Sequence, residues 1–165
     1  MNRRSVVRLC GSAAVAAAVV LAGLPAWGAG PAGPDRSHMV ERRVGDGHAL
    51  RDAGWGGVQI QVVHLSPDAV PSAARTLLGR YPLDRYTIFL VSLDTHAGDL
   101  SGYDMAALSE LVAAGKTYAP VRWEGIAESS HHRLGALIFP RVDLPADLVI
   151  RAVGGVAART FRWLP

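Results

Sequence analysis

The sequence predicts a mainly β protein, an antiparallel Ig-like β-sandwich with one or two short helices. Three observations lead to this prediction. Short segments rich in Val, Ile, Leu and aromatic residues recur from residue 58 onward, turn residues separate them, and only two stretches show helical spacing. The chain has no Cys-Trp-Cys pattern, so the Ig-like comparison concerns architecture alone.

Six short strands follow from the pattern of apolar residues. In the first predicted strand, β-branched apolar residues alternate with polar ones. The second has apolar residues on both faces, and in the last polar and aromatic residues alternate up to Trp163. We expect strands at residues 58–65, 86–93, 118–123, 134–139, 148–153 and 159–163.

Two segments carry helical spacing. Residues 71–80 follow a Ser-Pro-Asp turn and predict a short helix between the first two strands. Residues 104–114 also fit a helix, which Asp104 would cap. The same stretch fits a strand that forms a hairpin with residues 118–123 through residues 113–116. Local propensity favours the helix and the sandwich favours the strand, so both alternatives stay open.

Residues 1–28 are predicted to be an export signal. The first eight positions carry three arginines and no acid, and residues 9–26 form an apolar run. We expect cleavage after Gly28, and the remaining alternative is an uncleaved membrane anchor, since roughly 20 apolar residues can just span a bilayer. The Arg3-Arg4 pair resembles a twin-arginine signal, and the general and the twin-arginine export routes both remain open. Either route predicts a periplasmic or secreted protein.

The remainder of the chain is expected to have two parts. Residues 29–57 are rich in Gly and Pro and show no apolar periodicity, so we expect a flexible linker with at most a marginal strand or turn. Residues 58–165 are expected to form the β-sandwich domain. About 137 residues after the signal are enough for one such domain.

Composition excludes several function classes. Removing Arg3, Arg4 and Arg8 with the signal leaves 14 of the 17 basic residues against 14 acidic ones, so the mature part has no basic excess for nucleic acid. Cys10, the single cysteine, also leaves with the signal. Disulfide exchange, thiolate zinc sites and cysteine-ligated copper are therefore excluded, and no membrane span is expected once the signal is removed.

The candidate functional residues are histidines and acids in two turns. If the strands form a simple meander, His96, Glu124, Glu128, His131 and His132 gather at one end of the sandwich. Imidazoles with nearby carboxylates suit copper or zinc. Adjacent residues of an extended segment point to opposite faces, so only one of His131 and His132 is expected to join His96. The predicted metal site is therefore His96, His131 or His132, and Glu128.

The same residues allow two alternatives to a metal site, a solvated loop and a serine hydrolase. The segment from Ser129 to His132 also fits a solvated loop, and Asp94 and Asp99 are common turn formers. A serine hydrolase built on Ser129 or Ser130 lacks the strand-turn-helix elbow that exposes a catalytic serine. We therefore predict no catalytic residues. The sequence favours a non-enzymatic exported binding module whose partner is an envelope protein or a metal ion.

Four segments carry a resemblance: Leu93-Asp94-Thr95-His96 with Asp99-Leu100, Pro120 to Gly125, Ser130 to Gly135, and Phe161-Arg162-Trp163. They look like a group of small uncharacterised exported bacterial proteins. The resemblance covers residues 58–163 and implies a β-rich domain without implying an activity. Where such sequences commonly read Gly-His-His-Arg-Ser-Gly, this chain has Ser130 and Leu134 at the two differing positions.

Overall fold

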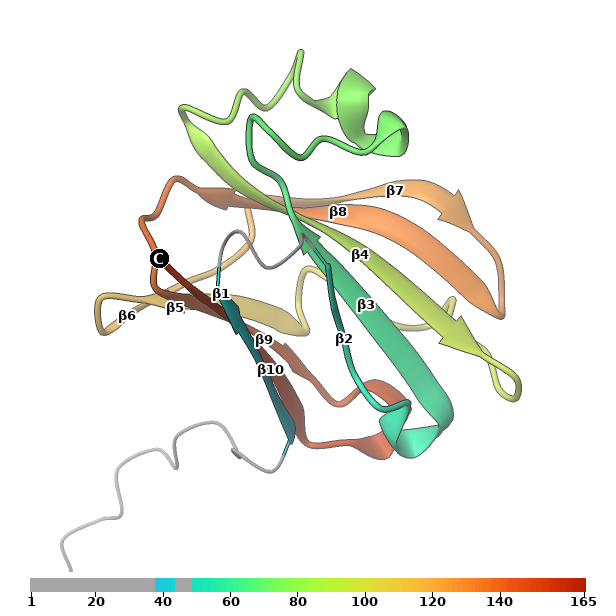
Figure 1. Cartoon of the computed structure of the whole chain (residues 1–165). Coiled ribbons are helices and arrows are strands. Elements are labelled where there is room, and N and C mark those ends of the chain that lie inside the picture. The colour runs from blue at the N-terminus through green and yellow to red at the C-terminus, as the bar shows by residue number, and fades with distance from the viewer. Residues whose placement is uncertain (1–37, 44–48) are drawn as a thin grey trace, which may run out of the picture. The chain divides into compact units, whose positions relative to one another are not determined.

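Two five-stranded sheets pack against each other in a computed structural model that describes residues 38–43 and 49–165 (Figure 1). The strand order of the first sheet is β1 (Met39–Arg43), β10 (Ala158–Leu164), β9 (Ala146–Arg151), β5 (Ser109–Ala113) and β6 (Lys116–Tyr118). The order of the second sheet is β2 (Ala49–Arg51), β3 (Val58–His64), β4 (Tyr86–Thr95), β8 (His132–Pro140) and β7 (Arg122–Glu128). The predicted mainly β sandwich is therefore confirmed.

The first sheet is mixed, which differs from the expected antiparallel arrangement. Its edge strand β1 runs parallel to β10, with Met39 opposite Thr160, while every pairing in the second sheet is antiparallel. The pairing joins the first described strand to the last one. A contact between segments so far apart in the chain cannot be predicted from the local pattern of apolar residues. The topology thus departs from a fully antiparallel Ig-like sandwich.

The segment expected to be a linker contributes to both sheets. Within residues 29–57 the structure describes 38–43 and 49–57, which hold β1, β2 and the 3₁₀ turn η2 (Trp55–Gly57). Leu50 belongs to the main core and is only 2 % exposed. These strands are too short to show periodicity among the surrounding glycines, which is why the sequence suggested a linker. The predicted signal, residues 1–28, lies outside the described residues.

The stretch at 104–114 contains a strand rather than a helix. Asp104 caps only a turn, in which its Oδ1 accepts the N–H groups of Ala106 and Ala107 at 3.1 Å each. Strand β5 then forms a hairpin with β6 through Ala114 and Gly115, whose φ angles of 48° and 73° are both positive. Two positive φ angles match the right-handed twist of the flanking strands. Pairing with β9 therefore outweighs the local helix propensity.

The strand expected at residues 118–123 is split between the two sheets. Its first residue ends β6 in the first sheet, and Arg122 begins β7 in the second. Pro120 lies between them and has no N–H group to donate to a neighbouring strand, so the strand pairing is interrupted where the chain passes from one sheet to the other. The chain therefore changes sheets where the apolar pattern suggested one continuous strand.

The short helix predicted at residues 71–80 is present as the 3₁₀ helix η3 (Ser72–Leu77). Ala74 and Leu77 are buried against the outer face of the second sheet, where they join a cluster that includes Ile88 and Ile138. A larger core lies between the two sheets and contains Phe89, Phe139, Leu148, Phe161 and Trp163 among its buried side chains. Among the described residues, no helix is both long enough and apolar enough to cross a bilayer.

Four connections meet at one end of the sandwich, which we call the loop end (Figure 1). They are the β2–β3 turn, the β4–β5 loop, the β7–β8 turn and the β9–β10 turn, which contains the 3₁₀ turn η4 (Val153–Gly155). The Thr95 hydroxyl lies 2.9 Å from the Gly57 carbonyl oxygen, and the Thr95 N–H donates to the His131 carbonyl at 3.0 Å. The Gly154 N–H donates to the Tyr103 hydroxyl at 3.0 Å. The loop end is thus tied together by hydrogen bonds.

Candidate functional site

A histidine and an aspartate form a pair on the outer face of the second sheet. His132 and Asp94 lie opposite each other on β8 and β4, and His132 Nδ1 lies 2.7 Å from Asp94 Oδ1. The Ser92 hydroxyl donates to Asp94 Oδ2 at 3.0 Å and so fixes the carboxylate. The side chains are 71 % and 45 % exposed. The bond orients the imidazole and leaves its Nε2 atom for another partner.

His96 lies beside this pair. Both histidines line a pocket of about 270 Å³, which we call the histidine pocket. The turn that carries His96 is held by the Thr95 hydroxyl, which lies 2.6 Å from the Ala97 carbonyl oxygen. The pocket is lined by Gly54, Gly57, Gln59, Asp94, Thr95, His96 and His132. The structure thus brings two of the predicted ligands to one place.

The other two predicted ligands have different surroundings. His131 lies near Asp99 and contributes, after the hydrogen bonds from Ser101, to lowering the pKa of that carboxyl group. Glu128 bonds to Arg133 and Trp123, and these hydrogen bonds lower the pKa of Glu128. Within the described ranges, no group of three or more His, Cys, Asp or Glu side chains is placed to hold a metal ion.

Glu124 lies away from the loop end, contrary to the meander prediction. It lies within β7 and accepts a hydrogen bond from the Tyr81 hydroxyl at 2.8 Å, which raises the pKa of Tyr81. Arg122 and Arg80 also pair with its carboxylate, at 2.7 and 3.4 Å. The sequence placed the end of this strand at Trp123, whereas β7 continues to Glu128. Only Glu128 therefore reaches the loop end.

Arg133 holds the loop end together, a role that the sequence did not reveal. Its side chain is 7 % exposed, and Nη1 donates to the carbonyls of Leu100 and Tyr103 at 2.8 and 2.7 Å. Nε and Nη2 donate to Glu128 Oε1 at 3.1 and 2.6 Å. The guanidinium also lies over the Trp123 ring, 5.6 Å from its centroid. The signal available in the sequence was an arginine between His132 and the predicted strand at residues 134–139.

Two glycines form the floor beneath this cluster. Gly125 and Gly135 pair across β7 and β8. A Cβ atom on Gly135 would lie 2.3 Å from Trp123 Cζ2, and one on Gly125 would lie 2.7 Å from Glu128 Oε2. The absence of side chains at these positions allows the indole ring and the carboxylate to lie flat on the sheet.

We expect the two glycines to differ sharply in their tolerance of alanine. Gly135→Ala displaces a half-buried indole ring that packs on the core, and should lower the free energy of unfolding by about 1 to 3 kcal/mol. Gly125→Ala meets only the end of the flexible Glu128 side chain, which can move by rotation, so its cost should be smaller than that of Gly135→Ala. Urea denaturation monitored by tryptophan fluorescence measures both. Equal losses in the two variants would contradict this account of Trp123.

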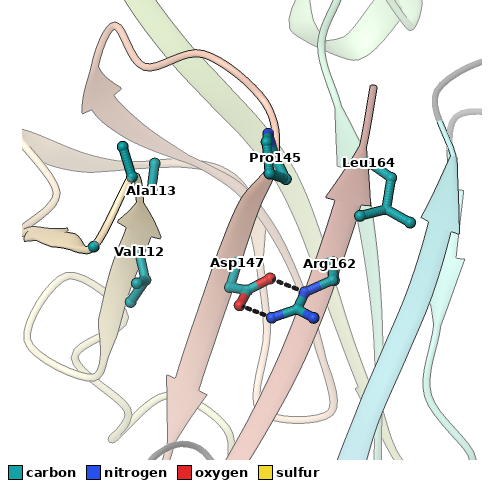
Figure 2. A pocket seen from close by; sticks show the side chains of 8 residues that line it. Val112, Ala113, Pro145, Asp147, Arg162 and Leu164 are labelled. Atoms are coloured by element: carbon teal, nitrogen blue, oxygen red, sulfur yellow. Dashed lines mark hydrogen bonds and ion pairs between the residues drawn. The ribbon is translucent and has the colours of Figure 1, made fainter.

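A second pocket, of about 300 Å³, lies on the first sheet (Figure 2). Asp147 on β9 and Arg162 on β10 pair across it, with Nε–Oδ1 and Nη2–Oδ2 distances of 2.6 Å each. The carboxylate raises the pKa of Arg162. Figure 2 shows apolar side chains around this ion pair, among them Pro145 and Leu164. Both oxygens of Asp147 are engaged by Arg162, so the pair fastens β9 to β10.

Of the two serines in the serine hydrolase alternative, Ser129 has its hydroxyl engaged in local hydrogen bonds. The Ser129 hydroxyl donates to the carbonyl of His132 and accepts from its N–H, at 3.0 Å each, while the His132 ring bonds Asp94. The hydroxyl therefore closes the β7–β8 turn.

Comparison of the chain with protein-family models, curated proteins and solved structures finds no significant match.

Proposed function

We propose that this protein is an exported, non-enzymatic binding module that takes up a zinc or copper ion at the histidine pocket. The observation that carries the proposal is the 2.7 Å bond between His132 Nδ1 and Asp94 Oδ1. Metal-ligating histidines usually donate their second ring N–H to a carboxylate or carbonyl, which fixes the tautomer and the ring orientation. Asp94 supplies that partner before any ion arrives.

The tautomer follows from this bond. Because a carboxylate only accepts hydrogen bonds, the neutral His132 ring carries its proton on Nδ1 and keeps the lone pair on Nε2. Neutral imidazole nitrogen is a preferred ligand of both Zn(II) and Cu(II). His96 lines the same pocket and supplies a second imidazole. Asp94 therefore acts as the orienting group, and the two histidines act as the ligands.

The export signal predicted over residues 1–28 agrees with this function. It would place the module in the periplasm or outside the cell, and would remove Cys10. Thiolates would then contribute nothing to metal binding, so imidazoles become the strongest ligands for transition metals that the chain offers.

We expect the purified protein, prepared without a polyhistidine tag, to bind Zn(II) and Cu(II) in calorimetric titrations at pH 7.5. His132→Gln should abolish the binding, because Nε2 is lost. Asp94→Asn should weaken it about 10- to 100-fold, which is the usual effect of removing an outer-shell partner. His131→Gln is the matched control, since His131 lies in the adjacent turn position outside the pocket, and should leave the affinity unchanged.

Lowering the pH gives an independent check, because protonated imidazole cannot bind a metal. Because the proton and the ion compete for the same imidazole nitrogen, metal binding should weaken as the pH is lowered and should return when pH 7.5 is restored. Absence of binding by the wild-type protein would refute the proposal. Unchanged binding in a folded His96→Gln, His132→Gln double variant would refute it equally, and far-ultraviolet circular dichroism confirms the fold.

A further inference from the structure

A second polar pocket at the loop end, of about 230 Å³, surrounds the buried Arg133 side chain, and we call it the arginine pocket. Arg133 lies opposite Leu93, a residue of the main core, so its side chain points to the inner face of the second sheet. The preceding residue, His132, points to the outer face. The arginine pocket and the histidine pocket are therefore separate. The arginine pocket is lined by Ser101, Glu128, Ser129, Ser130 and Arg133.

Arg133 keeps one hydrogen-bond donor free in this pocket. A guanidinium group carries five N–H groups. Four of those of Arg133 are taken by Glu128 and by two backbone carbonyls. Among the residues that the structure describes, the second N–H of Nη2 has no acceptor. Because the side chain is only 7 % exposed, a ligand that brings an acceptor to this N–H would satisfy a buried polar group.

Glu128 keeps a free acceptor beside this donor. Its Oε1 atom accepts the bonds from Arg133 and from the Trp123 indole N–H. The bonds from Arg133, and then the one from Trp123, lower the pKa of Glu128, so the group is an ionised carboxylate. No described residue donates to Oε2. The Ser130 hydroxyl, which forms no hydrogen bond within the described part of the chain, adds a group that both donates and accepts.

The chemistry of the lining narrows the class of ligand. Arg133 and Glu128 carry opposite charges, so the pair offers no net charge to an ion. None of the residues that line the pocket is apolar, so a ligand with a large apolar part gains little there. Pockets for drug-sized molecules usually measure roughly 300 to 1,000 Å³, so this one suits a single ring. A small, neutral ligand with several hydroxyl groups fits these conditions.

We infer that the arginine pocket binds one neutral sugar unit. One ring hydroxyl donates to Glu128 Oε2, its neighbour accepts from Arg133 Nη2, and a third bonds to Ser130. A primary amide from a peptide side chain offers one donor nitrogen and one acceptor oxygen and leaves Ser130 unused, which favours the sugar. The inference goes beyond the proposed function and does not depend on it. An exported module would meet such units in cell-surface polysaccharides.

Saturation-transfer difference NMR of the purified protein in EDTA, with glucose, galactose and mannose in turn, tests the inference. We expect at least one of these sugars to bind. Glu128→Gln keeps an oxygen for Arg133 but places an N–H donor where Oε2 was, and should weaken binding about tenfold or more. Ser130→Ala should weaken it about 3- to 10-fold. Ser72→Ala, on η3 and outside the pocket, is the matched control and should change nothing.

Several outcomes would overturn the inference. They are binding of none of the three sugars, equal affinity of the wild type and a folded Glu128→Gln variant, and tighter binding of acetamide than of every sugar. Sugar binding that requires added zinc would also overturn it, because the sugar would then be held at the histidine pocket. Far-ultraviolet circular dichroism checks the fold, and Ser130→Ala keeps the test decisive if Glu128→Gln fails to fold. Failure of zinc binding alone would leave this inference standing.

Discussion

Replacing Asp52 by alanine is expected to lower the free energy of unfolding by about 3 to 5 kcal/mol, because it leaves a buried arginine without its counter-charge. Arg159 and Asp52 are fully buried and bond at 2.7 Å. Burial lowers the pKa of Arg159, and Asp52 opposes that shift. The Asp52 carboxylate therefore compensates a guanidinium charge that has been removed from water.

The same ion pair is satisfied on all sides. Asp52 Oδ1 accepts the N–H groups of Gly54 and Ile60 at 3.0 and 2.9 Å. Arg159 donates through Nη1 to the Val153 carbonyl at 2.6 Å and through Nη2 to the Trp55 carbonyl. It thereby joins the β2–β3 turn of one sheet to the β9–β10 turn of the other. Loss of Asp52 should loosen both turns together.

Urea denaturation at pH 7 measures this loss. Glu110→Ala is the matched control, because it breaks a partly exposed ion pair with Arg151 that should contribute less than about 1 kcal/mol. A double variant, Asp52→Leu with Arg159→Met, should recover much of the stability lost by Asp52→Ala, since no unpaired charge remains. A loss no larger than that of the control would contradict the role assigned to this pair.

Gly56→Ala is expected to be about as damaging, at roughly 3 kcal/mol, from left-handed backbone strain and overpacking together. The turns η2 and η4 lie against each other through their backbones. A Cβ atom on Gly56 would lie 2.0 Å from the Gly154 carbonyl oxygen, and one on Gly154 would lie 2.8 Å from the Gly56 oxygen. Neither contact can be relieved by rotating a side chain, because both partners are backbone atoms.

Gly57→Ala separates the cost of backbone strain from the cost of overpacking. Gly57 has a φ of 72°, close to the 64° of Gly56, but a Cβ atom there would meet nothing within 4 Å. Its substitution should cost only the backbone strain, about 1 kcal/mol. Thermal unfolding followed by circular dichroism ranks the variants, and equal losses for Gly56→Ala and Gly57→Ala would show that the turns do not press against each other.

These two predictions concern the wall of the histidine pocket as well as stability. Gly54 and Gly57 line the pocket, and the Gly57 carbonyl lies 2.9 Å from the hydroxyl of Thr95, next to His96. The buried ion pair and the glycine contact therefore hold the surface from which His96 projects. This rigid support would keep the ligands of the proposed site in place.

The longer strands could be predicted from the sequence because their signal is local. Apolar and polar residues alternate over most of residues 58–65, and residues 86–93 carry apolar residues on both faces; β3 and β4 occupy these positions. The short strands β1 and β2 gave no such signal among the surrounding glycines. The helix propensity of residues 104–114 was also local, and it was overridden by pairing of β5 with β9.

The candidate site was predictable only in part. The sequence indicated that His96 could meet only one of two adjacent histidines. The register that sets Asp94 opposite His132 selects the second of them for the histidine pocket. The Arg133 cluster was missed because its partners, Leu100 and Tyr103, come from a loop without periodicity.

The sequence by itself determined the β class, the main strands and the turns that carry histidines, because apolar periodicity and turn chemistry depend on neighbouring residues. Only the tertiary structure decided the parallel pairing of β1 with β10, the backbone contact of Gly56 with Gly154, and the Asp52–Arg159 pair. The last of these joins residues 107 positions apart. Such contacts depend on how the two sheets pack, and no local pattern in the chain encodes that packing.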